Sequence, residues 1–174
     1  RLTIQIPRAK VHLSLSDAFL FLILLLFGGA AAVLVATAEA LVTSLRFRRT
    51  GINIRYDGVL FNCALMATST FLTVWTLRFM FGQVTELVTE HPAVFITAIC
   101  VMSLVQYAGN SMLAAVYTAL ETEQPVWETW NTHYFPTSFT YFVGAVIAGT
   151  LVRLVSDTSF YVVLAITPIT AIAY

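Results

Sequence analysis

The chain has 174 residues, of which 59% are hydrophobic and 10% are charged, and its formal net charge is zero. A soluble globular domain carries roughly 25% charged residues, so this chain has too little polar surface to coat a water-facing body. The neutral balance gives no reason to expect a nucleic-acid partner, and the high hydrophobicity excludes a disordered chain. The composition therefore predicts an integral membrane protein.

Residues 1–16 are mixed in polarity and are predicted to form a loop or a short amphipathic lead-in. The apolar run 17–27 follows, and at 1.5 Å per residue it is too short to cross a bilayer alone. Gly28 and Gly29 separate it from a second apolar run, 30–45. One long kinked helix is possible, since glycine pairs are common kink sites. A tight hairpin of two short helices is slightly favoured.

A cluster of arginines follows the second run: Arg46, Arg48, Arg49 and Arg55. Because cytoplasmic loops carry an excess of Lys and Arg, this loop is predicted to be cytoplasmic. The run 59–81 is long enough to span a membrane. Pro92 suits the start of the next helix, and the run 93–120 exceeds one membrane thickness. A tilt, kink or break is expected at Gly109 and Asn110 within it.

Residues 121–136 form a polar connector that carries three aromatic side chains, Trp127, Trp130 and Tyr134. Such rings favour the headgroup level, so an amphipathic interfacial turn is predicted. The apolar segments 137–155 and 160–174 complete the chain. Together these runs predict an all-α polytopic transmembrane bundle of about five to six helical segments, one or two of them broken or kinked. Residues 17–174 form one domain, expected to belong to a longer protein, with a cytoplasmic C-terminus.

Six polar side chains within the apolar runs are candidate ligand contacts: Glu39, Asn62, Ser103, Gln106, Tyr107 and Asn110. An ionisable group at membrane depth costs a few kcal/mol, so Glu39 should face the bundle interior. The last four share much of one helix face and form a polar stripe, which is typical of a pocket between helices. The alternative for each side chain is a structural hydrogen bond between helices, which stabilises a membrane bundle by about 1 kcal/mol.

The segment 137–155 carries two patterns of small residues, Gly144-x-x-x-Ala148 and Ala145-x-x-x-Gly149. Such patterns let helices approach closely, either within one fold or across a homodimer. The two cysteines are isolated in apolar runs, so neither a metal site nor a cofactor is expected. The motifs GxxxxGK[ST], GxSxG and HExxH are absent, and no enzymatic activity is expected within this chain.

Two stretches carry a resemblance to known proteins: IPRAKVHLSLSDAFLFLILLLFGGAAAVLVATAEALVTSLR and NSMLAAVYTALETEQPVWETWNTHYFPTSFTYFVGAVIAG. They resemble the earlier and later parts of multi-span N-terminal membrane domains of bacterial signalling proteins, and together they cover roughly half of the chain. In those proteins the membrane domain precedes a diguanylate cyclase, an HD-type phosphodiesterase or a histidine kinase. The resemblance implies a sensor in the bacterial inner membrane with a cytoplasmic output domain, and it names no ligand.

A looser resemblance lies in DAFLFLILLLFGGAAAVLVATAEAL, which is similar to substrate-binding membrane subunits of energy-coupling-factor vitamin transporters. This resemblance implies uptake of a small molecule and supplies the second hypothesis. A third hypothesis is a passive membrane anchor and dimerisation module built on the small residues of 137–155. The sensor is preferred, because its resemblance covers two parts of the chain and agrees with the interior polar stripe.

Overall fold

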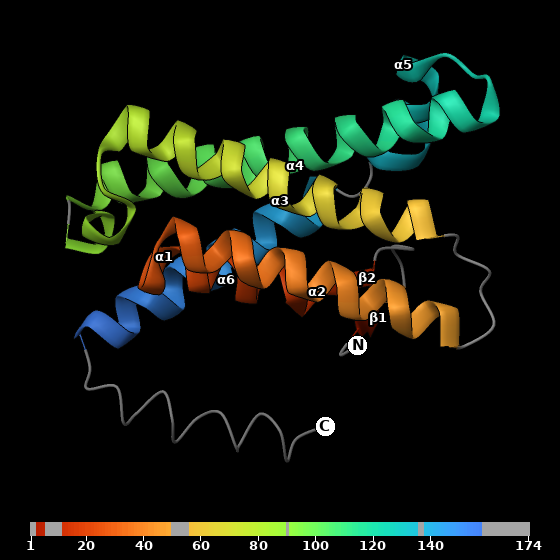
Figure 1. The fold of residues 1–174 in the computed structure, drawn as a ribbon. Helices are drawn as coiled ribbons and strands as arrows, with labels where there is room; N and C mark the ends of the chain where they lie inside the picture. The colour runs from red at the N-terminus through yellow and green to blue at the C-terminus, as the bar shows by residue number, and fades with distance from the viewer. Residues whose placement is uncertain (1–2, 6–11, 50–55, 90, 136–137, 158–174) are drawn as a thin grey trace.

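The computed structural model describes residues 3–5, 12–49, 56–89, 91–135 and 138–157 (Figure 1). Helices make up nearly all of these residues, which confirms the predicted all-α bundle. The predicted segment 160–174 lies outside the described residues. The lead-in contains a short antiparallel strand pair, β1 (Thr3–Gln5) and β2 (His12–Ser14), rather than only a loop. Its partly alternating polarity fits the two-residue period of a strand.

Helices α1 (Leu15–Phe27) and α2 (Gly29–Arg49) form a hairpin around Gly28. Gly28 has a φ of +84°, in the left-handed region that favours glycine. Figure 1 shows α1 running back along α2, and the two helices pack against each other. The favoured hairpin interpretation therefore describes this part of the chain.

The last turn of α2 contains three of the arginines that were predicted to lie in a loop: Arg46, Arg48 and Arg49. The helix continues through them because cations stabilise the negative end of the helix dipole. The guanidinium of Arg48 also stacks over the ring of Tyr56, 3.9 Å from its centroid. These residues define what we call the arginine end of the bundle.

Helices α3 (Tyr56–Phe81) and α4 (Pro92–Thr122) are antiparallel and are joined by the 3₁₀-helix η1 (Val84–Thr89). This connection defines the η1 end of the bundle. As predicted, Pro92 begins α4, and the His91 ring accepts a hydrogen bond from the amide of Ala93 at 3.4 Å.

Helix α4 is helical throughout, so the break that was one of the alternatives predicted at Gly109 and Asn110 is wrong, whereas a tilt or a kink stays a prediction. Gly109 instead serves close packing between helices. A Cβ placed on it would lie 3.4 Å from the Cβ of Ser69 on α3. The glycine therefore allows α3 and α4 to approach without interrupting the backbone hydrogen bonds of α4.

The predicted interfacial connector is largely helical. Helix α5 (Val126–Thr129) runs into the π-helical turn η2 (Trp130–Tyr134), which packs along α4. Helix α6 (Ser138–Asp157) follows at a bend of 55°. Together α5, η2 and α6 have the length and hydropathy of one broken span or of a re-entrant loop.

Helices α2, α3 and α4 are each long and apolar enough to span a membrane. Their outer surfaces expose large apolar side chains: Leu34, Leu60, Phe71, Phe79, Ile96 and Leu120. The ring of Phe79, for example, is 86% exposed. Several hydroxyls bond to the carbonyl four residues earlier, as Thr37 does to Val33 at 2.7 Å, so the helix itself satisfies them. This surface belongs in lipid, and the chain is a membrane protein.

The core lies where α1 meets α6, η1 and α2. Leu20, Phe21, Leu24 and Leu25 of α1 are buried, together with Val84 of η1. Helix α1 is too short to span a membrane, and the other elements cover one of its faces, whereas Phe19 and Phe27 on it are exposed. Its buried face fixes the position of α6 relative to α4, where the polar side chains of the interior meet.

Candidate functional site

The polar side chains of α4 face two different neighbours. Gln106 is buried against α3. Its Oε1 accepts a hydrogen bond from Thr73 Oγ1 at 2.8 Å, and its Nε2 donates to Thr70 Oγ1 at 3.3 Å and to Ser69 Oγ at 3.4 Å. Both N–H donors and the carbonyl oxygen of the amide are thus used. This geometry is that of a structural bond between helices, the alternative weighed for this residue.

Tyr107 and Asn110 face α6 instead, within a group that we call the central cluster: Tyr107, Asn110, Ser111, Trp130 and Tyr141. The Nδ2 of Asn110 donates to the hydroxyl of Tyr141, and Trp130 Nε1 donates to Ser111 Oγ at 2.9 Å. The ring of Tyr107 lies between two other rings, with centroid distances of 5.8 Å to Tyr141 and 6.2 Å to Trp130. Aromatic rings attract one another at these separations.

Two buried polar atoms of the central cluster have no hydrogen-bond partner within the described part of the chain. They are the hydroxyl of Tyr107 and the Oδ1 of Asn110. The Oγ1 of Thr129, in the last turn before η2, is a third such atom. Each buried, unpaired polar group costs about 1–3 kcal/mol and calls for an explanation. A bound molecule that supplies the missing partners is one such explanation.

The central cluster forms where several helices end or bend. Trp130 precedes the 55° bend, and Tyr141 follows it. The π-helical turn is held to α4 by Tyr134, whose hydroxyl lies 2.8 Å from Thr118 Oγ1. Single π-helical turns occur frequently at functional sites, and interrupted membrane helices often surround binding sites.

The start of α1 meets α6 next to this cluster. A Cβ on Gly144 would lie 3.3 Å from the backbone nitrogen of Ala18 and 3.5 Å from the Cβ of Asp17. Tyr141 lies one helical turn before Gly144 and bonds to Asn110, well inside α4. Helix α1 therefore begins well inside the bundle and places a carboxyl group beside the cluster.

The other predicted site residues lie elsewhere. Asn62 Nδ2 donates to the buried Ser44 Oγ at 3.2 Å, between α3 and α2. Glu39 is partly buried on α2, which packs mainly on α3 and α1. Ser103 is buried and donates to the carbonyl of Cys100 within α4 at 3.0 Å. Of the six candidates, the structure brings only Tyr107 and Asn110 together in the central cluster.

Three members of the central cluster were not among the predicted site residues: Ser111, Trp130 and Tyr141. Ser111 follows Asn110 and lies four residues after Tyr107, so helical spacing places it on the same stripe. Trp130 was assigned to the membrane interface, and Tyr141 lies on a different helix. No spacing rule within one helix could have brought these two to α4.

The small residues of α6 face inward. Ala145 and Ala148 are completely buried within the single chain. A Cβ on Gly149 would lie 3.1 Å from Cδ1 of Ile99 on α4. These residues therefore serve packing within the fold, and a homodimer through Gly144, Ala145, Ala148 and Gly149 stays a prediction.

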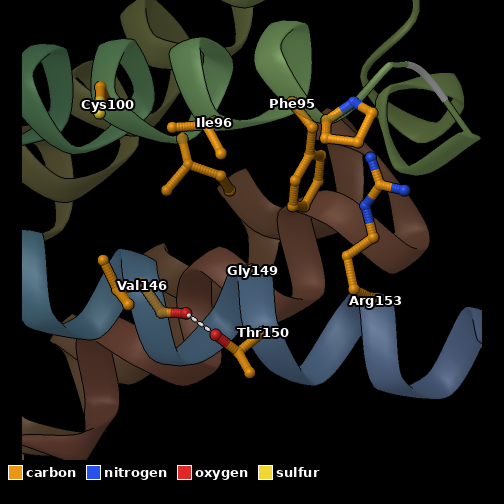
Figure 2. A pocket seen from close by; sticks show the side chains of 9 residues that line it. Phe95, Ile96, Cys100, Val146, Gly149, Thr150 and Arg153 are labelled. Atoms are coloured by element: carbon orange, nitrogen blue, oxygen red, sulfur yellow. Dashed lines mark hydrogen bonds between the residues drawn. The ribbon is translucent and has the colours of Figure 1, made fainter.

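A separate apolar groove of about 460 Å³ lies between α4 and α6, toward the η1 end (Figure 2). It is lined by Pro92, Phe95, Ile96, Ile99, Cys100, Val146, Gly149, Thr150 and Arg153. The guanidinium of Arg153 lies over the ring of Phe95, 4.6 Å from its centroid. The hydroxyl of Thr150 donates to the carbonyl of Val146 at 2.8 Å, so the wall of α6 offers no free hydroxyl proton there.

Among the described residues, no group of three or more His, Cys, Asp or Glu side chains lies close enough to hold a metal ion. The chain matches no family model, no curated protein and no solved structure. The central cluster and the apolar groove are therefore judged by their own chemistry.

Proposed function

We propose that the chain is a membrane-embedded input domain of a bacterial signalling protein in the inner membrane. It binds a small, partly lipophilic ligand between α4 and the bent segment of α5, η2 and α6. The observation that carries the proposal is a pair of buried polar atoms, Tyr107 Oη and Asn110 Oδ1, that have no hydrogen-bond partner among the described residues and lie in a site walled by aromatic rings. The resemblance of residues 6–46 and 110–149 to signalling membrane domains supports the sensory role.

The central cluster favours a ligand of defined chemistry. Asn110 Oδ1 accepts a hydrogen bond, and the hydroxyl of Tyr107 donates or accepts one. The rings of Tyr107, Trp130 and Tyr141 offer flat apolar faces. A planar, conjugated molecule with at least one N–H or O–H donor meets both requirements. It enters by separating the aromatic side chains at the bend, which leaves the hydrogen bonds of α4 intact.

Signal transfer follows from the position of the bend. The bond from Asn110 to Tyr141 holds α6 against α4. A ligand that inserts between the rings to reach Asn110 Oδ1 separates α6 from α4 at this contact and changes the angle of α6. Helix α6 ends at the η1 end, beside Pro92, so its movement would reach a cytoplasmic output domain through the apolar segment 160–174, which is predicted from the sequence to return across the membrane. A ligand shifts such an equilibrium only by its different affinities for the two angles.

Mass spectrometry of small molecules that co-purify with the detergent-solubilised protein tests the binding site. A specific compound is expected with the wild type, and its affinity is expected to fall roughly tenfold in Asn110→Ala and Tyr107→Phe, since each removes one hydrogen bond in a buried site. Asn62→Ala is the matched control, because it removes an amide that bonds between α2 and α3. Equal loss in Asn62→Ala would count against this location.

The reading frame downstream of Tyr174 tests the signalling role. A cyclase, phosphodiesterase or kinase domain in frame supports it, and ligand should then change the activity of that domain. If deleting residues 1–174 leaves regulation of the output domain unchanged, the sensory role is wrong.

A transport subunit is the second candidate. The short α1 and the broken span of α5, η2 and α6 favour it, because interrupted helices commonly form transporter sites at the bilayer midplane. Uptake of the co-purified compound into vesicles that contain the protein would favour transport. Binding without uptake would favour the sensor.

A further inference from the structure

We propose that the apolar groove between α4 and α6 is a binding site for one anionic membrane lipid, whose acyl chain lies along the groove and whose headgroup binds Arg153. The residues of this site differ from those of the central cluster. Either proposal can therefore fail without the other.

The walls of the groove fit an acyl chain. Phe95 and Ile99 are buried at its base, whereas Ile96 and Val146 on its rims are 62% and 60% exposed. The rims therefore lie on the surface that faces lipid. Polar ligands find no free hydroxyl proton on Thr150, because it is used within α6. Lipid tails are as apolar as leucine, so a tail from the surrounding bilayer matches these walls.

The hollow depends on Gly149. A Cβ at this position would lie 3.1 Å from Ile99 and 3.5 Å from Phe95, so any larger side chain would enter the groove or displace its base. The volume of about 460 Å³ falls within the range of roughly 300–1,000 Å³ found for small-molecule pockets. One acyl chain is an occupant of suitable shape, since the groove is elongated along two helices.

Charge selects the headgroup. Figure 2 shows Arg153 at one end of the groove, beside Phe95, and Cys100 toward the other end. The groove is thus cationic at one end and apolar along the rest. This distribution matches an anionic lipid, which has a charged headgroup at one end and an apolar acyl chain along the rest. A guanidinium has five N–H donors in a planar fork that matches a phosphate, so it can serve a headgroup in addition to partners within the chain.

Depth in the membrane agrees with this assignment. Pro92 begins α4 at the η1 end, and it lines the same end of the groove as Phe95. Arginine side chains near helix ends extend toward the headgroup level. The Phe95 ring supports the guanidinium in that position by a cation–π contact. The phosphate groups of the surrounding lipids lie at this level, so a lipid can supply the anion and no soluble ligand is needed.

Native mass spectrometry of the full chain in detergent, with phosphatidylglycerol or phosphatidylcholine added, tests the site. Phosphatidylglycerol should bind more tightly to the wild type. Arg153→Gln should lower its affinity roughly tenfold, as loss of a hydrogen bond to a charged group predicts. Arg78→Gln is the matched control, because Arg78 is an exposed arginine at the same end that lies outside the groove.

A second pair of variants tests occupancy of the groove itself. Val146→Trp fills it from an exposed rim and should lower the affinity for phosphatidylglycerol at least tenfold, whereas Val116→Trp, at an exposed position of α4 outside the groove, should leave it unchanged. Equal effects of Arg153→Gln and Arg78→Gln would overturn the proposal, because the preference would then be general electrostatics. It is also overturned if Val146→Trp keeps wild-type lipid binding, or changes only the oligomeric state, which would assign the groove to a second copy of the chain.

Discussion

At the scale of single residues, two amides on one helix have opposite surroundings. Gln106 finds three hydroxyl partners on α3, whereas Asn110, four residues later, uses its nitrogen and leaves its buried oxygen without a partner in the described residues. Both were expected on one polar stripe. The difference arises because α3 presents hydroxyl groups to α4, while α6 presents aromatic rings.

Gln106→Leu should therefore affect stability and leave ligand binding unchanged. Loss of the amide is expected to lower the free energy of unfolding by about 1 kcal/mol, the usual contribution of hydrogen bonds between membrane helices. Unfolding in mixed micelles with increasing dodecyl sulfate measures the change.

Gln83→Leu provides the control, because Gln83 is exposed outside the bundle and accepts only a long hydrogen bond, of 3.5 Å, from Arg78. Its effect should stay within about 0.5 kcal/mol, as for other surface substitutions. If Gln106→Leu abolished the co-purifying compound as strongly as Asn110→Ala, the separation between structural amide and binding amide would be incorrect.

At the scale of elements, close approach of helices depends on individual small residues. The hairpin turn at Gly28 brings Gly29 against α3, where a Cβ would overlap the side chain of Val74. The Ser44–Asn62 bond fixes the other end of the same pair of helices. Helices α2 and α3 are thus held together at one end by the close packing of Gly29 against Val74 and at the other end by the Ser44–Asn62 hydrogen bond.

Gly29→Ala should destabilise the protein by about 1–3 kcal/mol, because overpacking forces backbone and side-chain shifts. Val74→Ala makes room for the new methyl group. The double variant should therefore be more stable than the sum of the two single effects predicts, as contacting residues do not act independently. A strictly additive double variant, measured by the same unfolding assay, would show that the two residues are not in contact.

At the scale of the whole molecule, the arginine end of the bundle carries a cluster of cations beside several acidic side chains. The arginines are Arg46, Arg48 and Arg49 on α2. The acidic residues are Glu121, Glu123 and Glu128, at the C-terminal end of α4 and in the connector that follows it. Acidic residues count little in membrane orientation, so the arginines decide it. We expect the arginine end to face the cytoplasm and the η1 end to face the opposite side.

Single-cysteine variants test this orientation in a background that lacks Cys63 and Cys100. Glu121→Cys near the end of α4 should react with a membrane-impermeant maleimide in inside-out vesicles, and Gln83→Cys should react in right-side-out cells. Both positions are exposed. The reverse pattern would invert the orientation, and labelling of both sites from one side would contradict a spanning α4.

The sequence by itself determined the membrane character, the helical class and the order of the apolar segments. Long runs of apolar residues indicate segments that lie in lipid. These segments must be helical, because lipid offers no hydrogen-bond partners to an unpaired backbone. The sequence also predicted the start of α4 at Pro92, because the preference of proline for the first helical position depends only on the local backbone.

Only the tertiary structure decided which polar side chains meet. Helical spacing placed Gln106, Tyr107 and Asn110 on one face, but it could not show that α3 satisfies the first and α6 contacts the others. Trp130 and Tyr141 reach Tyr107 through a 55° bend between separate helices. Such contacts depend on distances across the bundle, which are set by the packing of glycines and buried rings rather than by any pattern along one segment.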